Sequence, residues 1–183
     1  MALAPVTPRR GTLWIARRVA IFVAVFVALT GLEYATRART APFVNGVLNV
    51  EAGSRLIQLL SPGEAVHPNG NRIESATTAI QVAQGCEGLD VMLLLVAALV
   101  ATPLAARRKL VGALAGVAVI YAVNLLRLVG LWYCLKLAPA YFESMHVIVG
   151  QTVVIVVAVA VFAAASGILA RASTPGPAAR EGV

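Results

Sequence analysis

The sequence contains few charged residues, and this scarcity excludes an ordinary soluble globular protein. Charged residues make up 13% of the chain and hydrophobic residues 60%. A typical soluble domain carries about 25% charged residues. The mean hydropathy of +0.85 points the same way. The composition is that of an integral membrane protein.

Cysteine is also scarce, with Cys86 and Cys134 as the only two. Two cysteines do not make a disulfide framework, although one bridge between them is chemically permitted if both lie outside the cell. The alternative for Cys134, inside a long apolar segment, is a small buried apolar residue.

Aromatic residues amount to 6%, and they are not interleaved with basic residues in any exposed patch. The formal net charge of +7 therefore does not indicate nucleic-acid binding. The Lys and Arg residues lie beside apolar runs instead, which is typical of membrane topology. The chain also lacks internal repeats, which a small transporter usually shows.

Four apolar runs predict an all-α integral membrane protein with about four transmembrane helices. The predicted spans cover about residues 14–34, 88–106, 110–134 and 147–170. The first run has a short apolar centre, which Trp14 and the neighbouring arginines extend. We expect one membrane-embedded domain over residues 1–171 and a disordered cytoplasmic tail over 172–183, which is rich in Pro, Ala and Ser.

The basic residues predict the orientation of these helices. With four spans, nine of the fifteen Lys and Arg residues fall on one side: Arg9, Arg10, Arg17, Arg18, Arg107, Arg108, Lys109, Arg171 and Arg180. The positive-inside rule makes this side cytoplasmic, with both termini inside and residues 107–109 in a tight turn. A cleaved signal peptide is the alternative for the first run, but residues 33–38 offer no convincing cleavage site, so we expect a retained anchor.

The segment between the first two spans has its own organisation. Apolar residues over 43–60 predict an amphipathic helix at the outer interface, ended by Ser61-Pro62-Gly63. The turn signal Pro68-Asn69-Gly70-Asn71 predicts a short β-hairpin within residues 64–83, directly before Cys86.

Arg127 is the only charged residue between Leu110 and Leu135. A guanidinium inside a membrane span costs roughly 2.5–3.5 kcal/mol on insertion scales, so it points to a function or a partner. The residue lies about 17 positions beyond Leu110, or roughly 26 Å, which puts it near the outer boundary. Asn124 shares its helical face, and Trp132 beyond it is expected in the interfacial aromatic belt.

Two further reactive residues lie at the same predicted depth. Cys86 stands in Gly85-Cys86-Glu87-Gly88 at the outer mouth of the second span, where two glycines permit an unusual backbone. His146 stands at the outer mouth of the fourth span. A thiolate nucleophile, an imidazole acid/base and a cation that stabilises an oxyanion together suit acyl transfer.

Other readings of these residues stay open. Arg127 alone fits a structural residue near the interface, an anion site in a small transporter, or a non-catalytic assembly subunit. Cys86, Glu143 and His146 together offer a zinc-site alternative. Gly112 and Gly116 have the spacing of a helix-packing face.

The ordered set Gly85-Cys86-Glu87-Gly88-Leu89, Asn124-Leu125-Leu126-Arg127 and Glu143-Ser144-Met145-His146 resembles the exosortase/archaeosortase family, over about residues 80–165. The context of Asn124 is most similar to the exosortase H subgroup. The resemblance implies Cys86 as nucleophile, Arg127 as oxyanion or substrate-orienting cation, and His146 as acid/base. Asn124, Gly85 and Gly88 would support them. Glu87 is a further supporting residue, and it departs from the Ser that many relatives carry. A carboxylate beside a thiolate opposes ionisation of the thiol, and the alternatives are that Glu87 pairs with Arg127 or reads a substrate.

The resemblance also implies an activity: cleavage of the C-terminal sorting tail of exported proteins through a thioester, with neither metal nor cofactor. Such tails consist of a short motif, a transmembrane helix and a basic end. The implied location is the bacterial inner membrane, with the active site facing the periplasm, where an acceptor of unknown identity or water completes the reaction.

Overall fold

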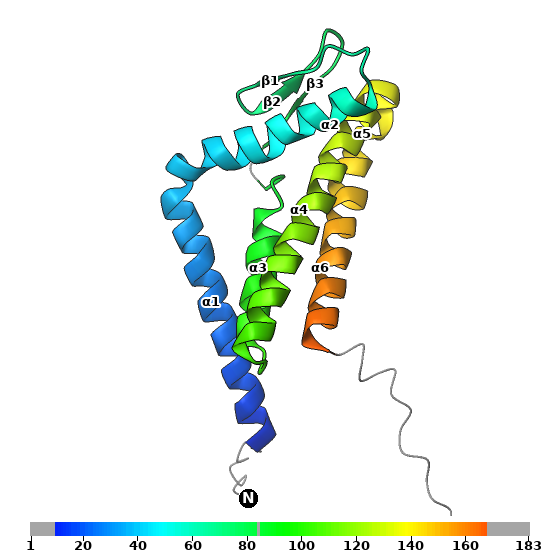
Figure 1. Ribbon diagram of the computed structural model, residues 1–183. Helices are drawn as coiled ribbons and strands as arrows, with labels where there is room; N and C mark the ends of the chain where they lie inside the picture. Colours follow the sequence, from blue (N-terminus) through cyan, green and yellow to red (C-terminus); the bar gives the residue numbers. More distant parts are fainter. Residues whose placement is uncertain (1–9, 84, 168–183) are drawn as a thin grey trace, which may run out of the picture.

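The computed structural model describes residues 10–83 and 85–167 as a bundle of apolar helices with a small cap at one end (Figure 1). The long helices are α1 (Arg10–Ala41), α3 (Leu89–Ala101), α4 (Ala106–Leu137) and α6 (Gln151–Ser166). The remaining elements are η1 (Pro42–Glu51), α2 (Ala52–Leu60), β1 (His67–Asn69), β2 (Arg72–Glu74), β3 (Ala79–Gln81), η2 (Pro139–Tyr141), α5 (Phe142–Ser144) and η3 (Met145–Gly150).

Helix α1 continues into η1 and α2 but changes direction, so that the second half lies across one end of the bundle (Figure 1). Pro42 is the first residue of η1, and a proline inside a helix removes one hydrogen bond and bends the axis. On the far side of the bend, Ile57 is buried and Leu59 is exposed. The predicted amphipathic helix is thus confirmed, and it ends at Leu60 before Ser61 as expected.

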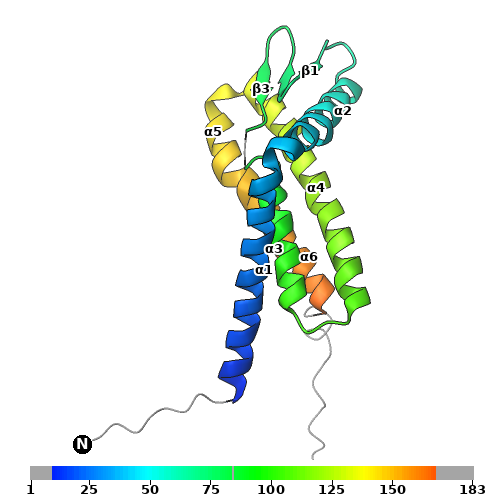
Figure 2. The same ribbon diagram turned by 90° about the vertical axis from the view of Figure 1, so that its left-hand side faces the viewer.

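The cap contains three short antiparallel strands in the order β1-β2-β3. The predicted hairpin is confirmed as β1 and β2, and Gly70 supplies the positive φ of 59° that its turn requires. Strand β3 adds to the other edge of β2 and pairs Ile73 with Ile80. Both isoleucines are buried, and a Cβ added to Gly53 of α2 would lie 2.9 Å from Ile73 Cδ1, so the sheet rests on α2 (Figure 2).

Four apolar helices, α1, α3, α4 and α6, form the bundle, as the sequence predicts. Three helical stretches are long and apolar enough to span a membrane: Gly11–Leu60, Ala106–Leu137 and Pro139–Ser166. The predicted spans at residues 14–34 and 110–134 fall inside α1 and α4, and the last span falls in η3 and α6. Residues 168–170 of that span and the tail 172–183 lie outside the described residues.

Helix α3 is shorter than the predicted span. It has 13 residues and ends at Ala101, because Pro103 cannot continue a helix and holds Thr102 in an extended conformation. The expected tight turn at residues 107–109 was wrong for the same reason. The turn lies at 102–105, and Arg107, Arg108 and Lys109 belong to the first turn of α4.

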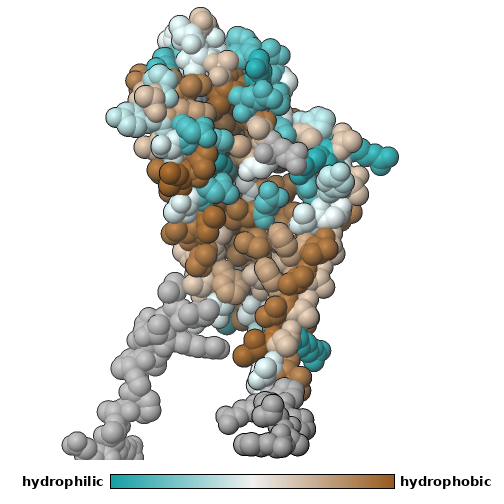
Figure 3. All heavy atoms as spheres, turned by 180° about the vertical axis from the view of Figure 1, so that it is seen from behind, coloured by the Kyte–Doolittle hydropathy of each residue, from teal (hydrophilic) through white to brown (hydrophobic). Residues whose placement is uncertain are grey.

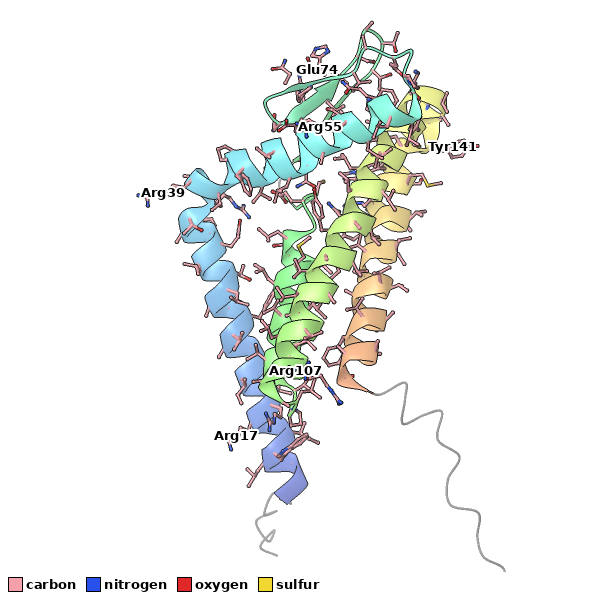
Figure 4. All side chains as sticks on the ribbon, in the orientation of Figure 1. Arg17, Arg39, Arg55, Glu74, Arg107 and Tyr141 are labelled. Atoms are coloured by element: carbon pink, nitrogen blue, oxygen red, sulfur yellow. The ribbon has the colours of Figure 1, made fainter. Side chains whose placement is uncertain are left out.

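The described basic residues expected on one side lie together at the end opposite the cap. Figure 4 shows Arg17 of α1 and Arg107 of α4 there, whereas Arg55 and Glu74 lie in the cap. Arg18 also belongs to this end, where its Nη1 donates to the carbonyl of Ala101 at 3.1 Å. This bond ties the start of α1 to the end of α3.

Gly112 and Gly116 form the predicted packing face of α4. A Cβ added to Gly116 would lie 2.4 Å from Leu95 Cδ2 of α3 and 2.9 Å from Val161 Cγ1 of α6. The same atom at Gly112 would lie 3.0 Å from the Cβ of Ala165. The absence of side chains therefore lets three helices approach closely.

The apolar interior is divided into two cores. The bundle core joins α3, α4 and α6 and consists of Val91, Met92, Leu95, Leu99, Ile120, Val154 and Ala158. The cap core joins η1, α2 and the strands to the far end of α4, and includes Val50, Ile57, Ile73, Ile80, Leu128 and Trp132. Trp132 is fully buried in this core, so its predicted place in an aromatic belt was wrong.

Polar residues occupy the level between the two cores. On α4, Asn124 and Arg127 follow Ile120 of the bundle core and precede Leu128 of the cap core. Asn49, Cys86 and His146 occupy the corresponding level of η1, the turn before α3, and η3. We call these five residues the polar layer.

Candidate active site

The turn that carries Cys86 requires glycine on both sides. Gly85 and Gly88 have φ values of +85° and +75°, a region that other residues rarely adopt. A Cβ at Gly88 would also lie 3.0 Å from Cγ of Asn124. Within the turn, Glu87 Oε2 accepts a hydrogen bond from the backbone N–H of Gly85 at 2.6 Å. The two glycines and Glu87 therefore shape the backbone on which the thiol is presented.

The thiol of Cys86 and the imidazole of His146 are in direct contact. Cys86 Sγ lies 3.3 Å from His146 Nε2, although the two residues are 60 positions apart. The ring of Phe142 stacks on that of His146 with centroids 5.7 Å apart, which holds the imidazole in place. A thiol and a neighbouring base at this distance can form the thiolate that attacks a carbonyl.

Asn124 links the α4 helix to the cysteine turn. Its side chain is buried, and its Nδ2 donates to the backbone carbonyl of Cys86 at 3.0 Å. The second hydrogen of the same nitrogen faces Asn49 Oδ1 at 3.5 Å. Its Oδ1 accepts a hydrogen bond from Arg127 Nη1 at 3.3 Å. One amide thus connects the backbone of Cys86 to the guanidinium.

Arg127 completes the network from the other side. Its Nη2 donates to the backbone carbonyl of His146 at 3.3 Å, so the guanidinium connects Asn124 to the segment that carries the imidazole. The three residues singled out by the sequence therefore meet in one hydrogen-bonded cluster, as expected. Among the described residues, no carboxylate pairs with Arg127, and its Nε is buried without a partner. Beyond the two hydrogen bonds to Asn124 and His146, Nη1 and Nη2 each carry one further N–H donor without a partner among the described residues.

Two residues of the site were not found from the sequence. Asn49 is 1% exposed in η1, where its Nδ2 donates to the carbonyl of Val44 at 2.8 Å and its Oδ1 faces Asn124. Gly150 makes room for Arg127, because a Cβ there would lie 2.6 Å from Arg127 Nε. An Asn in an apolar stretch of η1 and a Gly four residues after His146 were the available signals.

An ion pair within α1 is influenced electrostatically by carboxylates near the start of α3. The Glu33 carboxylate accepts two hydrogen bonds from Arg37, at 2.7 and 2.9 Å. This contact raises the pKa of the Arg37 guanidinium; burial opposes the effect, and the charges of Glu33, Glu87 and Asp90 add to it. An ion pair between Glu87 and Arg127 is not found within the described part of the chain.

The alternatives based on Cys134 and Glu143 find no support in the geometry. Cys86 and Cys134 are both free thiols, and Cys134 Sγ lies 3.8 Å from the carbonyl of Ala138. Within residues 10–83 and 85–167, no group of three or more His, Cys, Asp or Glu side chains gathers to hold a metal. The zinc-site alternative is therefore absent from the described residues.

The fold and this site define the class of protein: an integral membrane protein with a cysteine–histidine pair between a helical bundle and a cap. The family described as transmembrane exosortase matches residues 5–163 of the chain. The chain belongs to this family, and the resemblance noted from the motifs is confirmed. Membership implies a membrane cysteine peptidase or transpeptidase. No curated protein and no solved structure is significantly similar to the chain.

Proposed function

We propose that this protein is a membrane-embedded cysteine transpeptidase that removes the C-terminal sorting tail of exported proteins through a thioester intermediate. The observation that carries the proposal is the 3.3 Å contact between Cys86 Sγ and His146 Nε2, held in a network with Asn124 and Arg127. We place the cap on the outer face of a bacterial inner membrane, because the described basic residues of the predicted inner side gather at the opposite end.

In the first half of the reaction, His146 accepts the proton of the Cys86 thiol, and the thiolate attacks the scissile carbonyl carbon to form a C–S bond. The negative charge that develops on the carbonyl oxygen is stabilised by an N–H donor of Arg127. His146 then donates its proton to the leaving amine as the C–N bond breaks, which leaves a thioester on Cys86.

In the second half, an acceptor amine or water attacks the thioester carbon while His146 accepts the proton of the acceptor. The C–S bond breaks, His146 returns its proton to the Cys86 thiolate, and the cleaved protein is joined to the acceptor or released as an acid. Asn124 and Asn49 act on this cycle through position, since Asn124 holds the carbonyl of Cys86 and Asn49 faces the same amide. The assignment to the exosortase H subgroup stays a prediction.

The test is processing of a tailed substrate by variants of the proposed catalytic residues. The protein is co-expressed with an exported reporter that carries a motif–helix–arginine tail, and tail removal is followed by gel shift. We expect Cys86→Ala to abolish processing, and His146→Ala and Arg127→Ala each to lower its rate at least about 100-fold.

Cys134→Ala is the matched control, because it removes the other thiol, whose hydrogen-bond partner among the described residues is the carbonyl of Ala138. It should process at the wild-type rate. Normal processing by all three site variants would favour the non-catalytic assembly subunit. Mass spectrometry of a stalled reaction should find the reporter attached to Cys86 through a bond that hydroxylamine cleaves.

A further inference from the structure

Helix α3 places the reactive cysteine below the level of the cap. The helix has 13 residues, or about 20 Å, whereas the hydrocarbon core of a bilayer is about 30 Å thick. Cys86 precedes α3 by three residues, so with the inner end of α3 at the inner boundary of the hydrocarbon the thiol lies within the outer part of the membrane rather than above it. A peptide bond that reaches this sulfur has to approach from the side, through the plane of the bilayer.

An apolar groove runs along α3 on the membrane side of the polar layer. Helices α1 and α6 both pack against α3 but not substantially against each other within the described residues. The floor of the groove is α3, and its walls are Phe22 of α1 and one face of α6. The lining residues are Phe22, Val91, Leu94, Leu95, Ala98, Ile155, Ala158, Val159 and Phe162, around a volume of about 210 Å³.

The groove continues toward the basic end of the bundle. There, a second hollow of about 340 Å³ is lined by α1 and the end of α3, and it shares Phe22 and Ala98 with the first. Val159, which lines the first hollow, is 62% exposed, and Val23 of α1 is 49% exposed. Figure 3, the view from behind, shows apolar residues over the lower part of the molecule and hydrophilic ones gathered above.

The depth of this groove matches a transmembrane helix whose outer end is cut at Cys86. Its α3 residues lie 5 to 12 positions beyond Cys86, or roughly 8–18 Å along the helix. Its α6 residues lie 9 to 16 positions beyond His146, or roughly 14–24 Å. The floor and one wall thus lie on the helices that follow Cys86 and His146 in the sequence, starting roughly 8 and 14 Å below these two residues. The small side chains of Ala98 and Ala158 permit close approach of another helix.

A larger groove of about 690 Å³ between α4 and α6 fits this role less well. Much of it, including Gly130, Cys134 and Leu137, lies on the cap side of the polar layer. Cys86 lines neither groove, and although Arg127 lines the α4–α6 groove, the α1–α3–α6 groove is the one whose lining lies wholly on the membrane side of the polar layer.

We infer that the α1–α3–α6 groove is the docking site for the transmembrane helix of the substrate tail, an inference that rests on the proposed function. The occupant enters laterally between α1 and α6, lies along α3, and presents the peptide bond at its outer end to Cys86. A second copy of this chain, or a substrate seated between α4 and α6, would be the other occupants of such surfaces.

The test is photo-crosslinking in the full-length Cys86→Ala protein, using a tailed reporter that the wild-type protein processes. A photoreactive amino acid replaces Val159 in the α1–α3–α6 groove, Val153 in the α4–α6 groove, or Val156, which lines neither. We expect a crosslink to the tail helix from position 159 only. Crosslinks from position 153 instead, from neither groove, or only between two copies of this chain would overturn the inference.

A groove-filling variant gives a second readout with a matched control. Val159 and Val156 are both valines of α6 with exposures of 62% and 59%. Val159→Trp should lower tail processing about tenfold or more at limiting substrate, while the alkylation rate of Cys86 by iodoacetamide stays unchanged. Val156→Trp should change neither.

The two hypotheses fail differently in these experiments. A wild-type protein that leaves every tested tail intact overturns the proposed function, and the inference with it. Processing by the wild type with an equal rate in Val159→Trp overturns the docking site alone.

Discussion

At the scale of single residues, the site depends on glycines as much as on reactive groups. Gly85 and Gly88 set the backbone around Cys86, and Gly150 leaves the space that Arg127 occupies. Arg127 contacts both Asn124 and the carbonyl of His146, so its position determines how two segments of the chain face each other. A small displacement of this guanidinium is therefore transmitted to the base.

Gly150→Ala tests this dependence without removing any reactive group. The added Cβ would lie 2.6 Å from Arg127 Nε, so the guanidinium has to shift. Misplacement of a catalytic group by about 1 Å can lower a rate about 100-fold, and we expect a loss of this order in tail processing. Gly31→Ala, which adds a methyl group where nothing lies within 4 Å, should leave the rate unchanged. Equal rates for the two variants would contradict the positioning role of Arg127.

The candidate site residues Cys86, Arg127 and His146 could be recognised from the sequence because polar residues are rare in and beside the apolar segments that cross a membrane. Arg127 stands alone in an uncharged run, and Cys86 and His146 stand at the ends of two others. Asn49 and Gly150 could not be recognised in this way. Asn49 contacts Asn124, 75 positions away, and Gly150 contacts Arg127, 23 positions away; a local sequence pattern does not reveal such pairs.

At the scale of elements, close packing of α4 against two helices depends on its small-residue face. Gly116 lies against Leu95 of α3 and Val161 of α6, and a Cβ there meets both at under 3 Å. Because these neighbours are themselves packed in or against the bundle core, they have little room to move.

Gly116→Ala should therefore destabilise the protein by about 1–3 kcal/mol through overpacking. Gly130→Ala in the same helix has nothing within 4 Å of the added methyl group, and should stabilise by about 0.5–1 kcal/mol through helix propensity. Unfolding of the purified proteins in mild detergent, followed by circular dichroism, gives both values. A Gly116→Ala protein as stable as its Gly130 counterpart would refute the packing assignment.

The boundaries of the elements were predicted unevenly, for physical reasons. The end of the amphipathic helix was correct because Ser61-Pro62-Gly63 is a strong local signal. The end of α3 was missed because apolar residues continue on both sides of Pro103, and hydropathy alone does not register the lost backbone donor. Strand β3 was missed because three residues without a strong turn signal make a weak pattern.

At the scale of the whole molecule, two cores meet at the polar layer. The cap core is formed by side chains of η1, α2, the strands and the far end of α4. The bundle core is formed by side chains of α3, α4 and α6. The amphipathic helix and the β1–β2 hairpin of the cap were predicted from the sequence, but the cap core was not. Trp132 lies in sequence next to a membrane span, and it becomes buried only when α2 and the sheet fold over it. The two cores are expected to respond separately to core mutations.

Ile57→Ala tests this separation. Ile57 is fully buried in the cap core, so the cavity should destabilise the cap by about 2–5 kcal/mol. Hydrogen exchange followed by mass spectrometry should show faster exchange in α2 and the strands, with unchanged exchange in α3 and α6. Leu59→Ala in the same helix alters a side chain that is 76% exposed and should leave exchange unchanged in α2, the three strands, α3 and α6. Faster exchange throughout the bundle in Ile57→Ala would indicate one cooperative unit.

The shortness of α3 has a consequence for the lipids around the protein. A helix of about 20 Å in a hydrocarbon layer of about 30 Å creates a hydrophobic mismatch, which a bilayer relieves by thinning locally. On the side of α3 that the other helices leave open, where Leu94 and Val100 are exposed, such thinning would bring headgroups and water toward Cys86. Under the proposed function, an apolar peptide would reach Cys86 from within the lipid. A hydrophilic acceptor would reach the same sulfur atom from the aqueous phase.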